Sequence, residues 1–302
     1  MNARLWCGFA GLCLLSGSGW ALKEFWTAPT SGLTGIALHD SVLCLLFLFV
    51  SQRFKSNKSA PARWISIAAW GATLLALPQV LLASASGTVS GSSVVLIYTL
   101  VPVIVVVFVG QRAGFGVQES PLTLLGPALA GVAGAALLLP FMLPSSTPGT
   151  LWFIVMVLAA VFAGVAAIKL HSLLANAEIF RALTIISAAA AGLCLAVAAL
   201  TWSPIKQATP KDVAIELASC LFLDGPLLLL TAWLLRTMNP VAFSSRYLLI
   251  PLVTIVEGFI IVRPPLNWAA VGAILLAGGG LALLKSGNPD QEQVPISRTN
   301  QP

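Results

Sequence analysis

The stretch YTLVP at residues 98–102 recurs as YLLIP at residues 247–251, with tyrosine aligned on tyrosine and proline on proline. Other matches at a similar shift, of about 146 to 149 residues, are Leu5-Trp6 with Leu151-Trp152, Lys23 with Lys169, Gly126 with Gly272 and Gly134 with Gly280. These matches indicate an internal duplication. We therefore predict two repeats, 1–143 and 144–286, followed by a polar and disordered tail, 287–302.

The composition identifies the class of protein. Of the 302 residues, 58% are hydrophobic and only 9% are charged, and the mean hydropathy is +0.95. An ordinary soluble domain has about 45–50% apolar and about 25% charged residues. So few charges cannot cover the exterior of a soluble fold of this size, which argues against a soluble enzyme, a nucleic-acid-binding module and a disordered chain. The sequence predicts an integral membrane protein.

A helix needs about 20 mostly apolar residues to cross the hydrocarbon core of a bilayer. Ten such runs follow one another along the chain, at 4–22, 32–51, 63–83, 88–110, 121–140, 150–170, 178–201, 212–235, 240–262 and 266–285. Each repeat then holds five spans, and an odd number of spans inserts the second copy upside down. The predicted fold is all-α, with ten transmembrane helices in two inverted five-helix repeats. Small residues at 126–134 and 272–280 predict close packing between helices.

The first span has an alternative interpretation as a signal peptide, because Arg4 precedes an apolar stretch that ends in small residues at 16–21. The repeat needs this segment as a helix and favours a membrane span. With the amino terminus in the cytoplasm, eleven lysines and arginines fall in inner segments and four in outer ones, while Arg246 lies within a span, which accounts for all 16. The positive-inside rule therefore predicts a multi-pass protein of the inner (plasma) membrane with both termini cytoplasmic.

The five cysteines all lie in apolar stretches and form no CxxC pair, and we expect no histidine to lie nearby. We expect neither a disulfide framework nor a metal site from them. The sequence contains no phosphate-binding loop, zinc motif, dinucleotide fingerprint or Ser/His/Asp arrangement, so we expect no cofactor and no enzymatic activity. The expected partners are the lipid bilayer and a small-molecule substrate, without nucleic acid. The sequence leaves the oligomeric state open.

A charged side chain at membrane depth costs about 2.5 kcal/mol or more, so each one is a candidate for function. Asp224 is the first candidate, because it lies near the middle of the span 212–235. Gly225 and Pro226 follow it directly, and the proline permits a kink in the helix. The alternative is that Asp224 is a structural carboxylate paired with a neighbouring helix.

Arg246 and Glu257 lie eleven residues apart in the span 240–262, on one helix face with about 16 Å of rise between them. They are too far apart to pair, and a shared polar face suggests that they line a wet cavity. The alternative is that each side chain snorkels to the nearer interface. His39 and Asp40 lie at a depth comparable to that of Glu257, which suggests an outer polar cluster that exchanges protons. A structural role for the histidine is the alternative.

Pro102 and Pro251 each follow a tyrosine by four residues and mark corresponding points of the two repeats. Interrupted helices at matched positions are typical of transporter binding sites. The two tyrosines, Tyr98 and Tyr247, are therefore candidates for substrate contact, with packed core aromatics as the alternative. Gln79 is a weaker candidate for lining the same cavity.

Several of the residues named above lie in three longer stretches of sequence. They are Ser16-Gly17-Ser18 followed by Lys23, YTLVPVIVVVFVGQR at 98–112 leading into LLGPALAGVAGAALL at 124–138, and YLLIPLVTIVEGF at 247–259 leading into AVGAILLAGGGLALL at 270–284. In these stretches the chain resembles the drug/metabolite transporter superfamily, specifically its EamA-type members with ten helices from two five-helix repeats. The resemblance covers nearly the whole chain. Gly110-Gln111-Arg112 stands where family members often have Gly-Glu-Arg, and His39-Asp40 where an arginine is frequent.

The resemblance implies a secondary transporter, in a family whose members carry amino acids, drugs, sugar phosphates, nucleotide sugars and lipid-linked carriers. We expect export of small organic metabolites, amino-acid-like compounds or drugs, by alternating access, driven by the substrate gradient or by proton antiport. The alternative within the fold is a lipid-linked or nucleotide-sugar/phosphate transporter, because a cavity-facing Arg246 would suit a phosphate. Outside the fold, the alternatives are a membrane-embedded enzyme or a scaffold. They are disfavoured because the sequence has few polar side chains that could converge on one site.

Overall fold

The computed structural model describes residues 3–19, 32–53, 63–85, 88–110, 121–139, 144, 146–201, 209–262 and 267–286. Within these ranges all regular structure is helical and there is no strand. This is the expected outcome for a chain that must satisfy its backbone hydrogen bonds inside each apolar segment.

The helices follow the predicted spans closely. In the first half of the chain they are α1 (Ala3–Gly17), α3 (Leu33–Arg53), α4 (Trp64–Ser84), α5 (Gly91–Tyr98), α6 (Val101–Gly110) and α7 (Pro121–Leu138). In the second half they are α8 (Thr147–Leu174), α9 (Ile179–Leu200), α10 (Pro210–Ser219), the π-helical turn η1 (Cys220–Asp224), α11 (Gly225–Thr237), α12 (Pro240–Ser244), α13 (Arg246–Val262) and α14 (Asn267–Lys285).

Eight helical runs among the described residues are long and apolar enough to cross a membrane. This confirms the prediction of an all-α chain with the helices of a multi-pass membrane protein. The predicted spans 4–22 and 121–140 contain shorter apolar helices, α1 and α7, so the count of ten spans stays a prediction. α1 packs against α11 and α13 and buries Phe9 and Leu12 in the main core, which makes it an integral part of the bundle. The predicted tail, 287–302, lies outside the described residues.

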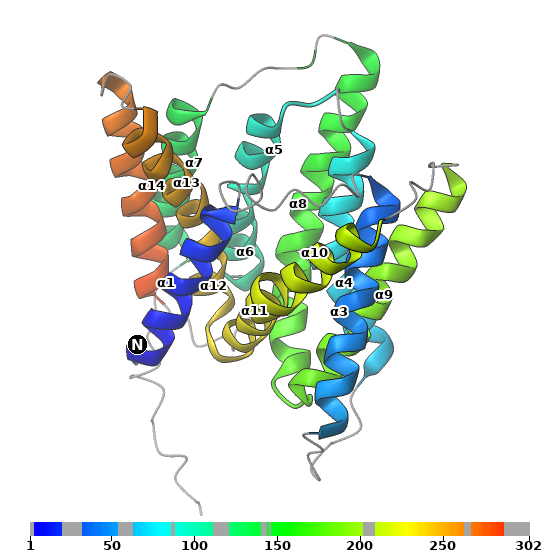
Figure 1. The fold of residues 1–302 in the computed structure, drawn as a ribbon. Helices are drawn as coiled ribbons and strands as arrows, with labels where there is room; N and C mark the ends of the chain where they lie inside the picture. The colour runs from blue at the N-terminus through cyan, green and yellow to red at the C-terminus, as the bar shows by residue number, and fades with distance from the viewer. Residues whose placement is uncertain are drawn as a thin grey trace, which may run out of the picture.

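The helices form two groups that face each other (Figure 1). In one group α3 packs against α9, and α4 packs against both α8 and α9. In the other, α7 packs against α14 and α1 against α13. The run from α10 to α11 crosses obliquely in front of α8 (Figure 1), and α11 contacts α8 and α9 of one group and α1 of the other. This arrangement brings helices from both halves of the chain to the centre of the molecule.

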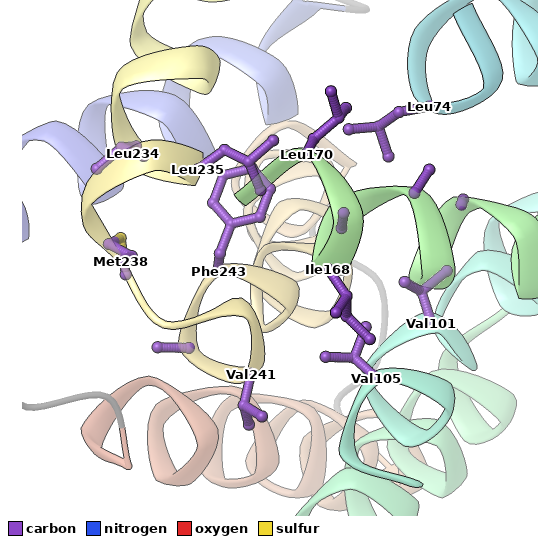
Figure 2. Close-up of a cluster of buried hydrophobic side chains, with 14 of the residues drawn as sticks. Leu74, Val101, Val105, Ile168, Leu170, Leu234, Leu235, Met238, Val241 and Phe243 are labelled. Carbon is purple, nitrogen blue, oxygen red and sulfur yellow. The ribbon is translucent and has the colours of Figure 1, made fainter. Parts of the chain in front are cut away.

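The largest buried cluster lies where α6, α8, α11 and α12 meet. Figure 2 shows its members Val105, Ile168, Leu235 and Phe243, one from each of these helices. Phe243, on the short helix α12, is completely buried. The segment around Phe243 is therefore held rigidly by the core, and it is this segment that carries Arg246.

The predicted close packing between glycine-rich helices is found between α7 and α14. A Cβ atom added to Gly134 would lie 2.5 Å from the carbonyl oxygen of Gly272, and one added to Gly279 would lie 2.4 Å from the carbonyl oxygen of Pro127. The opposing atoms belong to the backbone, so the two helices touch directly at these points, as small residues allow. Two glycines of the predicted faces, Gly126 and Gly278, face open space instead.

Candidate functional site

Two helical runs are interrupted where the halves of the chain meet. α5 ends at Tyr98 and α6 begins at Val101, just before Pro102. Proline has no N–H to donate and its ring clashes with the carbonyl four residues earlier, so it breaks the helix at this point as predicted. The second interruption separates α12 from α13 at Ser245. The two short helices α5 and α12 thus precede the longer segments α6 and α13.

The prediction that Pro251 marks the second interruption is wrong. Pro251 lies inside α13, six residues after the break. The hydroxyls of Ser244 and Ser245 instead donate hydrogen bonds of 2.7 Å and 2.6 Å to the carbonyl oxygens of Val241 and Ala242. Serine side chains that bond to the backbone in this way compete with helical hydrogen bonds, which explains why α12 ends here.

Arg246 is the first residue after this break and is buried, with 8% of its surface exposed. One terminal nitrogen, Nη2, donates a 2.9 Å hydrogen bond to the hydroxyl of Tyr247. The guanidinium carbon lies 4.2 Å from the ring centre of Phe243 and 4.7 Å from that of Tyr247. Its Nε atom is buried and has no hydrogen-bond partner among the residues that the structure describes. No carboxylate among the described residues forms an ion pair with it, so Arg246 is a buried and uncompensated cation.

Tyr98 completes this group, which we call the arginine site: Arg246, Tyr247, Phe243 and Tyr98. The rings of Tyr98 and Tyr247 are stacked, with centroids 6.2 Å apart and planes 25° apart. The hydroxyl of Tyr98 is buried, and no residue in the described part of the chain forms a hydrogen bond with it. The structure thus brings together three of the predicted substrate-binding residues, from helices that are separated by half the chain.

The arginine site is suited to binding an anion. Buried polar groups almost always have partners, so two unpartnered donors in one site require an explanation such as a missing ligand. A planar guanidinium binds carboxylate and phosphate oxygens through several of its N–H groups. The stacked tyrosine rings offer an apolar surface to the remainder of such a ligand.

Glu257 has a different environment from the one expected. Ser18 Oγ of the α1 end donates a hydrogen bond to its carboxylate. Nearby, Thr254 Oγ1 donates a 2.9 Å bond to the Gly17 carbonyl. Glu257 therefore helps to attach α13 to α1. His39 and Asp40 contact residues of other helices, so the suggested outer cluster of these two residues with Glu257 stays a prediction.

The second polar group joins α3 to the run α10–η1. It consists of His39, Glu216, Cys220 and Asp224, and we call it the histidine cluster. His39 Nδ1 lies 2.5 Å from Glu216 Oε1 and 3.4 Å from Cys220 Sγ. On the other side of the ring, Nε2 lies 3.9 Å from Asp224 Oδ2. Ser219 Oγ donates a 2.7 Å hydrogen bond to the same Asp224 oxygen. Asp224 thus has a partner on a neighbouring helix, in agreement with the structural alternative for it.

The π-helical turn explains how these side chains align. The N–H of Gly225 donates to the carbonyl of Cys220, five residues earlier, instead of four. Pro226 has no N–H for the carbonyl of Phe222, so the regular α pattern cannot pass through this point. The helix is therefore irregular just before Pro226. The wider turn places Asp224 on the side of the helix that Cys220 and Glu216 occupy, and all three face His39.

Replacing Gly225 with alanine is expected to destabilise the protein by about 1–3 kcal/mol, because overpacking a tight contact has this cost. Its Cβ would lie 2.5 Å from the carbonyl oxygen of Cys220 and 3.1 Å from Leu46 Cδ2. Thermal unfolding of the purified protein measures the effect. The control is Gly192→Ala in α9, where a Cβ meets nothing within 4 Å. Equal unfolding temperatures for the two variants would contradict this account of the π turn.

Sequence reasoning missed two members of the histidine cluster. Glu216 and Cys220 lie four residues apart, and Asp224 follows after four more. Residues four apart lie on the same face of a helix, so this spacing could have indicated a polar cluster on the span 212–235. The expectation that no histidine lies near a cysteine is wrong, because the imidazole of His39 contacts the thiol of Cys220. Folding thus creates a group of possible metal ligands that the sequence did not indicate.

The remaining candidates lie apart from both groups. Asp40 is buried between α3 and α9, where Cys194 Sγ lies 4.0 Å from its Oδ2 atom. Gln79 is an exposed residue of α4. No hydrogen bond of Gln79 to another described residue supports the prediction that it lines a binding cavity.

Comparisons with known proteins establish the fold alone. No family model matches the chain, and no curated protein matches it. Among solved structures 27 chains match. One of them, described only as a crystal structure of a protein, is similar over 94% of this chain and 96% of its own length, with a TM-score of 0.68 and 17% sequence identity.

Proposed function

We propose that this chain is a secondary transporter of the EamA type within the drug/metabolite transporter superfamily. It exports small organic metabolites across the cell's inner membrane by alternating access. The observation that carries the proposal is the arginine site, in which a buried guanidinium lies beside a buried tyrosine hydroxyl. Among the described residues, no carboxylate pairs with the guanidinium and no group forms a hydrogen bond with the hydroxyl. A buried charge is costly unless it is compensated, so a bound anion is the natural partner of Arg246.

The packing of the helices supports the proposed duplication into 1–143 and 144–286. Two contacts join helices at corresponding positions of the proposed repeats, α3 with α9 and α7 with α14. Other contacts occur in corresponding pairs: α6 packs against α8 as α13 packs against α1, and α6 against α7 as α13 against α14. Two five-helix repeats of inverted topology would produce this pattern. In this proposal there are ten spans and both termini are cytoplasmic.

The proposed substrate carries one carboxylate or a similar anionic group. Arg246 Nε and the Tyr98 hydroxyl would donate to this group, and the stacked rings of Tyr98 and Tyr247 would contact its apolar part. Amino-acid-like compounds have this combination. The interrupted helices around the site are the elements that would move, since transporter sites lie at broken helices between repeats.

A phosphate-bearing substrate is the second candidate, and the buried guanidinium favours it as well, because arginine binds phosphate oxygens in two places. A nucleotide sugar or a lipid-linked sugar carries more negative charge than one arginine compensates. The single cation of the arginine site therefore favours a singly charged metabolite over these substrates. If the purified protein transports phosphate esters, a phosphate-bearing substrate becomes the first candidate instead of a singly charged metabolite.

Two driving forces are compatible with the proposal. Glu257, His39 and Asp40 are the predicted proton-coupling residues, and the histidine cluster adds Glu216 and Asp224 as further groups that can bind a proton. Export driven by the substrate gradient alone needs none of them. Proton movement in fixed stoichiometry with substrate, measured in proteoliposomes, distinguishes antiport from facilitated diffusion.

Replacing Tyr98 with phenylalanine tests the site directly. If the hydroxyl binds substrate, the variant loses one hydrogen bond and substrate affinity falls about threefold to tenfold. Because the hydroxyl has no hydrogen-bond partner within the described ranges, we expect the unfolding temperature without substrate to be unchanged or higher. The measurements are the extracellular metabolite profile of overproducing cells and the KM of each exported compound.

The matched control is Ser187→Ala, which also removes a buried hydroxyl without a hydrogen-bond partner, but from α9. It should leave export at the wild-type level. If wild type exports nothing beyond an empty vector across amino acids, nucleosides and organic acids, the export proposal is wrong. If wild type exports a compound and Tyr98→Phe transports it equally well, Tyr98 is not part of the binding site.

A further inference from the structure

The histidine cluster has the composition of a metal site. It contains one nitrogen, one oxygen and one sulfur ligand atom, from His39, Glu216 and Cys220, and these atoms all lie within 4.8 Å of one another. Imidazole, carboxylate and thiolate are the three ligand types that proteins use for Zn²⁺. The cluster takes no part in the arginine site, proton binding does not require the thiol of Cys220, and export driven by the substrate gradient alone needs none of these residues.

The distances suit an ion of this size after small movements of the side chains. Zn²⁺ binds its ligands at about 2.0–2.3 Å, which places tetrahedral ligand atoms about 3.3–3.8 Å from one another. The separations here are 2.5 Å between His39 Nδ1 and Glu216 Oε1, 3.4 Å between His39 Nδ1 and Cys220 Sγ, and 4.0 Å between Cys220 Sγ and Glu216 Oε1. An ion bound between the three atoms would lengthen the separation of His39 Nδ1 and Glu216 Oε1 and shorten that of Cys220 Sγ and Glu216 Oε1.

The residues around the cluster resemble the outer shell of a metal site. A histidine ligand usually donates its second N–H to a carboxylate, which fixes the ring orientation. Here Nε2 of His39 lies 3.9 Å from Asp224 Oδ2, which is an ion-pair distance, and a small movement of either side chain would bring the two atoms to hydrogen-bond distance. Asp224 is in turn held by the hydroxyl of Ser219. The π turn that arranges Cys220 and Asp224 is itself a type of irregularity that occurs frequently at functional sites.

Burial and access also agree with this role. The thiol of Cys220 is completely buried and the side chain of Glu216 is 8% exposed. His39 and Asp224 retain 23% and 26% side-chain exposure, which leaves one side of the cluster open. Three protein ligands with an open fourth position are typical of zinc sites that bind a further molecule.

We propose that His39, Glu216 and Cys220 bind one divalent transition-metal ion of the Zn²⁺ class, with Asp224 as the residue that positions His39. Binding requires the thiolate, so the thiol proton is released to solvent as the metal–sulfur bond forms. The affinity for metal therefore rises with pH. This site is separate from the arginine site and goes beyond the transport proposal.

The test uses the full-length purified protein in detergent, stripped of metal with a chelator and titrated with Co²⁺ as a spectroscopic probe. We expect one Co²⁺ per chain, with a thiolate-to-cobalt charge-transfer band in the near ultraviolet that Zn²⁺ abolishes. Cys220→Ser should lose this band. Asp224→Asn should keep the band and bind Zn²⁺ about tenfold to a hundredfold more weakly, as substitutions of outer-shell residues do.

Cys194→Ser is the matched control, since it removes a different buried thiol, one that lies next to Asp40. It should bind Co²⁺ and Zn²⁺ as wild type does. X-ray absorption of the Zn²⁺-loaded wild type needs no variant, and we expect one sulfur ligand at about 2.3 Å. The absence of a cobalt charge-transfer band in wild type, its persistence in Cys220→Ser, or a zinc site without sulfur would each overturn the proposal.

Discussion

Arg246→Met is expected to reduce transport of the anionic substrate by about 30-fold to 3000-fold without impairing the fold. Truncating one partner of a desolvated, hydrogen-bonded charge pair costs about 2–5 kcal/mol of binding, and about 1.4 kcal/mol corresponds to a factor of ten. In the proposed complex Arg246 is that partner and the substrate anion is the other. The effect should appear in the KM for substrate in proteoliposomes and in the export profile of cells.

The same substitution should leave the stability of the substrate-free protein unchanged or higher. Methionine occupies a similar volume, and a buried charge that has no counter-ion does not stabilise the fold. The variant loses the cation–π contacts with Phe243 and Tyr247, at 4.2 Å and 4.7 Å, which together offset part of this gain. A higher unfolding temperature combined with lost transport would be characteristic of a charge retained for binding.

Arg246→Lys is the informative companion variant. Lysine keeps the positive charge but lacks the planar set of donors, so it should recover only part of the affinity for a carboxylate. Transport by Arg246→Met at the wild-type rate would exclude Arg246 from the binding site. A loss of transport accompanied by loss of folded protein would assign Arg246 to the structure instead.

Gly279→Val should have the largest effect on folding of any substitution considered in this protein. Its Cβ would lie 2.4 Å from the carbonyl oxygen of Pro127 and 2.8 Å from the backbone nitrogen of Gly131. Both atoms belong to the backbone of α7, so no side chain can move aside and the two helices must separate. We expect a destabilisation of more than about 3 kcal/mol, at the upper end of overpacking effects.

The neighbouring residue provides a matched control for this prediction. Gly278 precedes Gly279 in α14, but a Cβ there meets nothing within 4 Å. Gly278→Val should therefore give nearly the wild-type amount of monodisperse protein in detergent, while Gly279→Val should give little and unfold at a markedly lower temperature. Similar behaviour of both variants would show that α7 and α14 do not depend on this contact.

The candidate site was predictable only in part. Tyr98, Tyr247 and Arg246 could be found because each is a polar or aromatic residue next to a predicted helix break in an otherwise apolar span. Their contact in space could not be predicted, because it depends on how α5 and α12 cross. The second break was assigned to Pro251, whereas the hydroxyls of Ser244 and Ser245 determine it.

The histidine cluster shows the limit of sequence reasoning more clearly. His39 and Cys220 are 181 residues apart, and nothing in their local sequence indicates a contact. Their proximity arises from the packing of α3 against η1 and from the rotation of each helix about its axis. A rotation of either helix by about 100°, the angle per residue, would separate the two side chains.

The sequence by itself determined the helical class, the approximate ends of the helices and the apolar character of most spans. These properties are local: each long apolar run must satisfy its backbone hydrogen bonds within itself, and a helix does so. The tertiary structure alone decided that Arg246 is buried beside Tyr98 without a counter-ion, and that His39 lies against Glu216 and Cys220. Such contacts depend on the packing of helices distant in sequence, where side-chain shape at each crossing, as at Gly134 and Gly272, sets rotation and distance.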